Sequence, residues 1–156
     1  DLIHEGKIKS ALALCQKYDS PVARLIEKGI ERIGRPLPDI QAAVENMGNV
    51  EVARLEKGLP MLATISGGAP MIGFLGTVSG MIQAFFRMST AGNNIDITLL
   101  SGGIYEAMVT TVGGLFVGII AYFGYNYLTS QISNLVFKME STTIEFIDML
   151  HEPAGR

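Results

Sequence analysis

The stretch ITLLSGGIYEAMVTTVGGLFVGIIAYFGYNYLTSQISNLVF, residues 97–137, contains one charged side chain, Glu106. At about 1.5 Å per residue, a helix of this length is about twice as long as a bilayer is thick, so it should project beyond the lipid. A carboxyl group at a bilayer centre costs about 2.5–3.5 kcal/mol on the insertion scale. A chain that keeps such a group must pair it, protonate it or place it beside water. Glu106 therefore predicts a functional site, one suited to moving a cation.

A second stretch, residues 58–86, carries no charge over 29 residues, where about 20 are enough to cross a bilayer. Charged residues make up 17% of the 156-residue chain, against about 25% in soluble domains. Two membrane spans are predicted. The expected organisation is a cytoplasmic helical domain (1–57), a transmembrane helix (58–87), a periplasmic loop (88–96), a second transmembrane helix (97–128) and a cytoplasmic helical tail (129–156).

The segments outside the spans are also predicted to be helical. Residues 1–35 show two short amphipathic patterns, separated at Asp19-Ser20-Pro21. Asp39 is expected to cap the next helix, which should continue to Leu55. Gly58 and Pro60 are interpreted as a bend in a helix that runs on into the first span. The fold class is therefore all-α: a polytopic membrane protein whose long transmembrane helices extend into the cytoplasm.

The distribution of positive charge predicts how the spans are oriented. Nine Lys and Arg residues precede the first span and two follow the second, while the loop between the spans has none apart from Arg87 at its edge. Because cytoplasmic flanks carry an excess of positive charge, both ends of this chain are expected in the cytoplasm. Tyr122, Tyr125 and Tyr127 would then lie at the inner membrane interface.

Small residues recur every three or four positions on each span. This spacing lets helix backbones approach closely in lipid and is common among membrane helices. The predicted helix-packing residues are Gly73, Gly76 and Gly80 on the first span and Gly114 and Gly118 on the second.

Several classes of chemistry lack the residues they need. The net charge is −3, and the sequence has no basic stripe with interleaved aromatic residues, which argues against nucleic-acid binding. Thr77-Val78-Ser79-Gly80 is similar to the nucleophile motif of a serine protease, but His4 and His151 lie outside both spans and leave Ser79 without a base. Cys15 is single and is interpreted as a buried structural thiol. No enzyme activity, metal site or cofactor is predicted.

The two spans together resemble a known family. GAPMIGFLGTVSGMI (68–82) and GGIYEAMVTTVGGLFVG (102–118) closely resemble the last two spans of the ExbB/TolQ/MotA family of ion-driven bacterial motors. DLIHEGKIKSAL (1–12) and SPVARLI (20–26) resemble its cytoplasmic domain, and the ExbB branch is the most similar. The family also has an earlier span, so this chain is expected to lack an N-terminal part.

The resemblance implies a function and a set of partners. The family forms a ring, usually a pentamer in the ExbB branch, around two copies of a single-span partner of the ExbD type that bears an essential aspartate. Such a ring converts proton motive force into work on a TonB-like transducer at the bacterial inner membrane. The resemblance places the family's polar pathway residues on Thr77, Glu106 and Thr111, and the proline of the family's Ala-Pro pair on Pro70. Proton and sodium remain alternatives for the ion.

Helix geometry separates the polar residues of the second span. Thr110 is one turn from Glu106 and can share its face, but Thr111 is about 140° round the helix. Glu106 and Thr111 are therefore expected to serve two places, such as a lumen and a neighbouring interface. The alternative function is a non-conducting membrane scaffold in which Glu106 only locks helix register.

Overall fold

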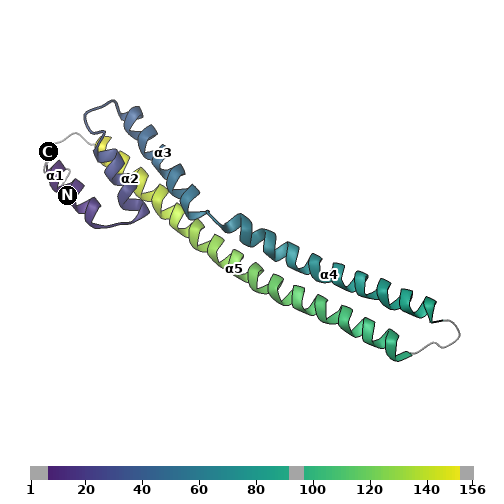
Figure 1. Ribbon diagram of the computed structural model, residues 1–156. Helices are drawn as coiled ribbons and strands as arrows, with labels where there is room; N and C mark the ends of the chain where they lie inside the picture. The colour runs from purple at the N-terminus through teal and green to yellow at the C-terminus, as the bar shows by residue number, and fades with distance from the viewer. Residues whose placement is uncertain (1–6, 92–96, 152–156) are drawn as a thin grey trace. The chain divides into compact units, whose positions relative to one another are not determined.

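The computed structural model describes residues 7–91 and 97–151, and the regular elements in these ranges are all helices. They are α1 (Ile8–Lys17), α2 (Pro21–Ile30), α3 (Leu37–Leu55), α4 (Leu59–Thr90) and α5 (Ile97–His151), shown in Figure 1. The predicted all-α class is confirmed. The chain forms two compact units: residues 1–57 with 130–156, and residues 58–129.

In the first unit, the break between α1 and α2 lies at the predicted position. The Ser20 hydroxyl accepts a hydrogen bond from the Ala23 N–H at 3.2 Å, and Pro21 occupies the first turn of α2. A serine cap followed by proline is a strong helix start, because it satisfies a free N–H and requires no N–H from the proline.

Two details of the expected helix boundaries are wrong. Asp39 lies in the first turn of α3 and is not its cap, since the Pro36 carbonyl already accepts from Asp39 and Ile40. Gly58 ends the helical path instead of bending it, because its φ of +98° is left-handed and separates α3 from α4. Glycine adopts this conformation without the strain that a side chain would introduce.

The core of the first unit joins helices from the two ends of the chain. Leu25, Ile30, Val44, Met139 and Phe146 are buried together with Ala11 and Ile40. Gly29 lies directly against the Phe146 ring, so α2 needs glycine at this point of contact. Cys15 packs half-buried against the same core, and burial raises the pKa of its thiol.

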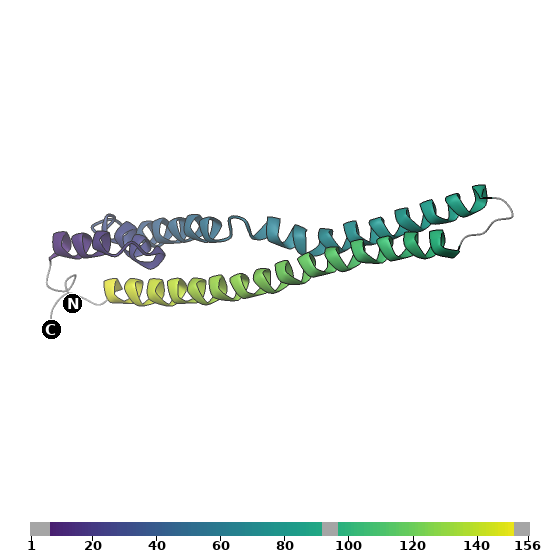
Figure 2. The ribbon, with the colours of Figure 1, turned by 60° about the horizontal axis from the view of Figure 1, so that its bottom comes forward.

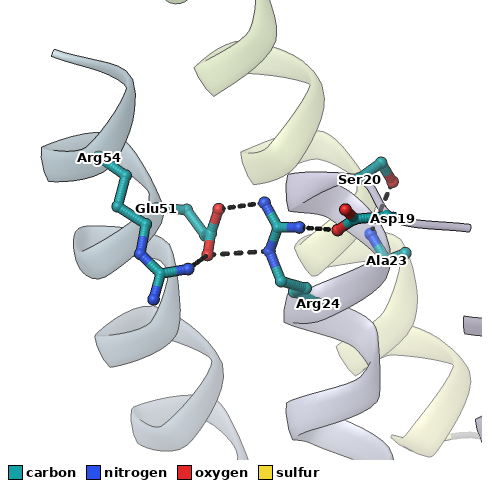
Figure 3. A network of polar contacts seen from close by, with 6 residues as sticks. All are labelled: Asp19, Ser20, Ala23, Arg24, Glu51 and Arg54. Carbon is teal, nitrogen blue, oxygen red and sulfur yellow. Dashed lines mark hydrogen bonds and ion pairs between the residues drawn. The ribbon is translucent and has the colours of Figure 1, made fainter. Parts of the chain in front are cut away.

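The Glu51 carboxylate is buried in the first unit, at the contact between α2 and α3 (Figure 3). Only 1% of the Glu51 side chain is exposed. Arg24 donates to both carboxylate oxygens, from Nε at 3.0 Å and from Nη2 at 2.7 Å, and Arg54 donates from Nη1 at 2.9 Å. Arg24 also pairs with Asp19. The hydrogen bonds from Arg24, with the charges of both arginines, hold the pKa of Glu51 below its ordinary value despite burial.

The second unit is a hairpin of two long helices, α4 and residues 97–129 of α5, which lie side by side in Figures 1 and 2. Its large apolar side chains point outward: Ile72 is 72% exposed and Phe116 is 67% exposed. A surface of this kind is unfavourable in water and suits lipid. Within the residues that the structure describes, two helices are long and apolar enough to cross a membrane, with mean hydropathy of 1.4 and 1.8 in their most apolar stretches.

Candidate functional site

The contact between α4 and α5 is made by small residues, and it defines the candidate site. A Cβ added at Gly103 would meet Ala84, and one added at Gly80 would meet Ala107. Farther along, one at Gly114 would meet Gly73, and one at Gly118 would meet Pro70. Residue numbers rise on one helix as they fall on the other, so the two helices are antiparallel.

Gly73 and Gly114 bring the two backbones into direct contact. A Cβ on Gly114 would lie 2.5 Å from the Ala69 carbonyl oxygen and 2.9 Å from the Gly73 Cα. A Cβ on Gly73 would lie 3.0 Å from the Thr110 carbonyl oxygen. Real Cβ atoms do not approach an oxygen as closely as 2.5 Å, so Gly114 cannot take even alanine unless the helices separate, and a Cβ on Gly73 would require its neighbours to move by a few tenths of an ångström.

Gly118 receives the ring of Pro70. A Cβ on Gly118 would lie 2.5 Å from the Pro70 Cγ and 3.1 Å from the Ser66 carbonyl oxygen. Proline has no N–H, so it cannot donate to the Ser66 carbonyl four residues earlier. The proline sits inside α4 while the helix continues through it, and glycine on α5 makes room for both its ring and the free carbonyl.

Thr77 and Thr111 meet across this contact. Their hydroxyls are hydrogen-bonded to each other, and either can be the donor. Thr77 can also donate to the Ala107 carbonyl at 3.0 Å, and Thr111 to the Gly73 carbonyl at 3.2 Å. Each hydroxyl thus has its partner threonine and a carbonyl of the opposite helix within reach.

Glu106 lies outside this threonine pair. It lines a groove of about 160 Å³ on the α4–α5 hairpin, which we call the Glu106 groove. The groove is formed by Gly76, Ser79, Gly80, Gln83, Ala84 and Arg87 of α4 and by Gly103, Glu106, Ala107 and Thr110 of α5. The Glu106 side chain is exposed, and within the described residues it makes no hydrogen bond or ion pair.

The structure therefore divides the three predicted pathway residues between two places. Thr77 and Thr111 form a hydroxyl pair inside the helix contact, whereas Glu106 shares the Glu106 groove with Thr110. Thr110 donates to the Ala107 carbonyl at 2.7 Å and lies 3.5 Å from the Gly73 carbonyl. This separation agrees with the angular argument from the sequence, which put Glu106 and Thr111 on different faces of α5.

Sequence reasoning did not identify Gln83 and Arg87 as lining residues. Both follow Gly76, Ser79 and Gly80 at helical spacing, so the signal was present along α4. The spacing alone does not show what this face of α4 contacts. The antiparallel register of α4 and α5 places it beside Glu106. Ser79 lines the same groove, while His151 is at the end of α5 and His4 lies outside the described residues.

Acids and other metal-binding side chains do not gather in this region. Across residues 7–91 and 97–151, no group of three His, Cys, Asp or Glu side chains is placed to hold a metal ion. The polar groups that the hairpin presents are hydroxyls, backbone carbonyls, the Glu106 carboxylate, the Gln83 amide and the Arg87 guanidinium.

Comparison with known proteins places these features in one family. The profile of the MotA/TolQ/ExbB proton channel family matches residues 17–141. A chain described as an ExbB homologue from Methanothermobacter thermautotrophicus is 33% identical over 88% of this chain and 48% of its own length. The Tol-Pal system protein TolQ of Haemophilus influenzae is 35% identical over 68% of this chain and 46% of its own.

The biopolymer transport protein ExbB of Xanthomonas campestris is 34% identical over 58% of this chain and 36% of its own length. The chain thus spans about half the length, or less, of these curated relatives. The family match covers both helices of the hairpin, the threonine pair and Glu106. The family is one of proton channels and not a class of enzymes. On this basis the chain is a membrane subunit that belongs to the MotA/TolQ/ExbB proton channel family.

Proposed function

We propose that this chain is the ring-forming subunit of an ion-driven motor in the bacterial inner membrane. In this proposal several copies, five by resemblance to the ExbB branch, surround an ExbD-like single-span partner that bears an aspartate. The assembly uses proton motive force to do work on a TonB-like transducer for uptake across the outer membrane. Residues 1–57 and 129–156 are cytoplasmic and residues 88–96 are periplasmic. Family membership and the names of the relatives support this proposal.

The observation that carries the proposal is the hydroxyl pair of Thr77 and Thr111 at the contact between the two helices of the hairpin. The two hydroxyls have two protons to donate, and their acceptors are each other and two backbone carbonyls. In one arrangement Thr111 donates to Thr77 and Thr77 donates to Ala107; in the other Thr77 donates to Thr111 and Thr111 donates to Gly73. The pair can therefore reverse its polarity and keep two hydrogen bonds in each state.

A reversible pair of this kind suits a site where a neighbouring acid changes its charge. A hydroxyl can donate to a carboxylate and can accept from a carboxylic acid, so it serves both protonation states of the partner's aspartate. One proton that crosses 100 mV yields about 2.3 kcal/mol, enough to bias a ring between arrangements. We propose that repeated protonation of the partner turns it within the ring.

Glu106 is proposed to line the ion path at a different level from the threonines. In the scaffold alternative, Glu106 fixes the register of α4 against α5, which requires a hydrogen bond from one helix of the hairpin to the other. Within the described residues it makes no such bond, and the register of α4 and α5 is already set by glycine contacts and by the threonine pair. An exposed acid in the polar Glu106 groove fits an ion path better than a lock.

Proton flux tests the proposal directly. Vesicles that contain this chain and its single-span partner should conduct protons, and Thr77→Val, Thr111→Val and Glu106→Ala should each reduce the flux strongly while leaving assembly intact. Thr64→Val is the matched control for Thr77→Val, because Thr64 is on the same helix and, within the described residues, its hydroxyl donates only to the Pro60 carbonyl of that helix, at 2.8 Å. Unchanged flux in all three pathway variants would support the scaffold instead.

A further inference from the structure

The first unit has an apolar groove with an acidic rim that the proposed ion path does not use. It lies between α3 and the last part of α5 and has a volume of about 560 Å³. We call it the acidic groove. Its apolar lining includes Val44 and Met139, which are buried in the core, and Ile144, which is 62% exposed. Its rim carries Glu45, Glu140 and Asp148.

The charge of the acidic groove is of one sign. No Lys or Arg lines it, and none of its three acids forms an ion pair with any part of the chain that the structure describes. Lys138 lies two residues from both Val136 and Glu140, so it points about 160° away from that face of α5. Arg54 is engaged with Glu51. An occupant that carries positive charge would therefore complement the rim.

The dimensions of the acidic groove fit one further helix. Its lining residues follow steps of three and four along α3, from Gln41 to Val52, and along α5, from Val136 to Asp148. At about 1.5 Å per residue each wall is about 17 Å long, or three helical turns. Such ridges accept the side chains of a third helix packed along them. Gly48 lies on the α3 wall and contributes no side chain to fill the space.

We propose that the acidic groove binds a cationic amphipathic helix, the cytoplasmic flank of a membrane partner. This inference rests on the proposed function, which places the first unit in the cytoplasm beside a single-span partner. Cytoplasmic flanks of spans carry excess Lys and Arg within about 15–20 residues of the membrane. A flank of three turns would set apolar residues on Val44, Met139 and Ile144 and its positive charges on Glu45, Glu140 and Asp148.

The test uses the full chain in nanodiscs of zwitterionic lipid and a labelled peptide of about three turns, with Leu on one face and Lys at its edges. Fluorescence anisotropy should show binding above that to empty nanodiscs, and this binding should weaken as salt rises. Glu140→Lys combined with Asp148→Lys should weaken it about tenfold, as expected when two ion pairs become repulsions. Ile144→Ser should weaken it as well.

Glu145→Lys is the matched control, because Glu145 is exposed and lies on the opposite face of the same helix. It should leave the affinity unchanged. Equal binding by the groove variants and the control would overturn the inference, as would a peptide with Glu in place of Lys that binds equally well. A change of oligomer mass in the groove variants, without a change in peptide affinity, would assign the groove to a second copy and also overturn it.

Failure of this inference can be told apart from failure of the proposed function. Peptide binding should persist in Thr77→Val, whose proton flux is expected to be lost. Intact flux with no peptide binding removes only the groove inference. Normal peptide binding with flux that ignores Thr77, Thr111 and Glu106 removes only the proposed ion path.

Discussion

Arg24 holds both oxygens of the buried Glu51 carboxylate, with Nε 3.0 Å from Oε1 and Nη2 2.7 Å from Oε2. This two-point contact joins α2 to α3 across 27 residues of sequence. Planar guanidinium groups match carboxylates in this geometry, and the hydrogen bonds are stronger than those between neutral groups. The Glu51 side chain is buried while Arg24 is partly exposed, so loss of Arg24 would leave a buried carboxylate without its main partner.

Removal of Glu51 should destabilise the first unit. In Glu51→Ala, Arg24 and Arg54 lose their shared partner, and breaking a buried pair costs about 3–5 kcal/mol. Thermal unfolding followed by circular dichroism should show a clearly lower midpoint. Glu31→Ala is the control: its pair with Lys28 is 2.8 Å long but about two-fifths exposed on each side, and it should cost less than about 1 kcal/mol. Equal effects of the two variants would contradict the structural role of Glu51.

The same carboxylate predicts a pH dependence. The pKa of Glu51 is lowered in the folded protein, so its stabilisation is fully present above the ordinary carboxyl pKa of about 4.3 and is lost as pH falls through the lower, folded value. The difference in melting temperature between the natural chain and Glu51→Ala should be large at neutral pH and should shrink in the acid range. A difference that stays constant down to about pH 3 would mean that the carboxylate is not the stabilising form.

The threonine pair should show energetic coupling. Thr77→Val and Thr111→Val each remove a hydroxyl from the same hydrogen-bonded pair, so the double variant should be less destabilised than the sum of the single ones. Hydrogen bonds between membrane helices are worth about 0.6 kcal/mol on average and up to about 1.7 kcal/mol. Unfolding of the four proteins in mixed detergent micelles measures this coupling. Strict additivity would show that the two hydroxyls do not interact.

Adjacent glycines on α5 should respond differently to alanine. Gly114→Ala would place its Cβ 2.5 Å from the Ala69 carbonyl oxygen and should separate the helices, at a cost of about 1–3 kcal/mol. Gly113→Ala meets nothing within 4 Å and should be neutral in the isolated chain. Stability in detergent should distinguish the two. If Gly113→Ala reduces flux without loss of stability, its face is in contact with another subunit.

A third glycine tests the core of the first unit. Gly29→Ala drives a methyl group into the Phe146 ring and should destabilise the unit, whereas Gly48→Ala makes only an ordinary contact of 3.8 Å with Leu25. Gly48→Ala should even stabilise α3 by about 0.5–1 kcal/mol, since alanine is the better helix former. Phe146→Leu should partly rescue Gly29→Ala, and thermal melts of the single and double variants measure this. Absence of rescue would place the strain elsewhere.

Much of the hairpin could be read from residue order. Two stretches long enough to cross a bilayer, one uncharged and one with Glu106 as its single charge, predicted its helices, and small residues at steps of three and four marked the faces that meet. The angle between Glu106 and Thr111 predicted that one helix would present them to different places. These features are local, because they depend only on composition and on the turn of a helix.

The partners of these residues were decided by tertiary structure. Nothing in the order of residues pairs Thr77 with Thr111, Arg24 with Glu51 or Gly29 with Phe146. Each pairing depends on how far one helix slides along another, and close packing of side chains selects one register among many with similar patterns. The sequence by itself determined which segments are helical and which belong in lipid. Both depend on the apolar residues of a segment and their spacing, which are local properties. Only the packing of the helices decided that the Thr77 and Thr111 hydroxyls are hydrogen-bonded to each other and that the Glu51 carboxylate is buried.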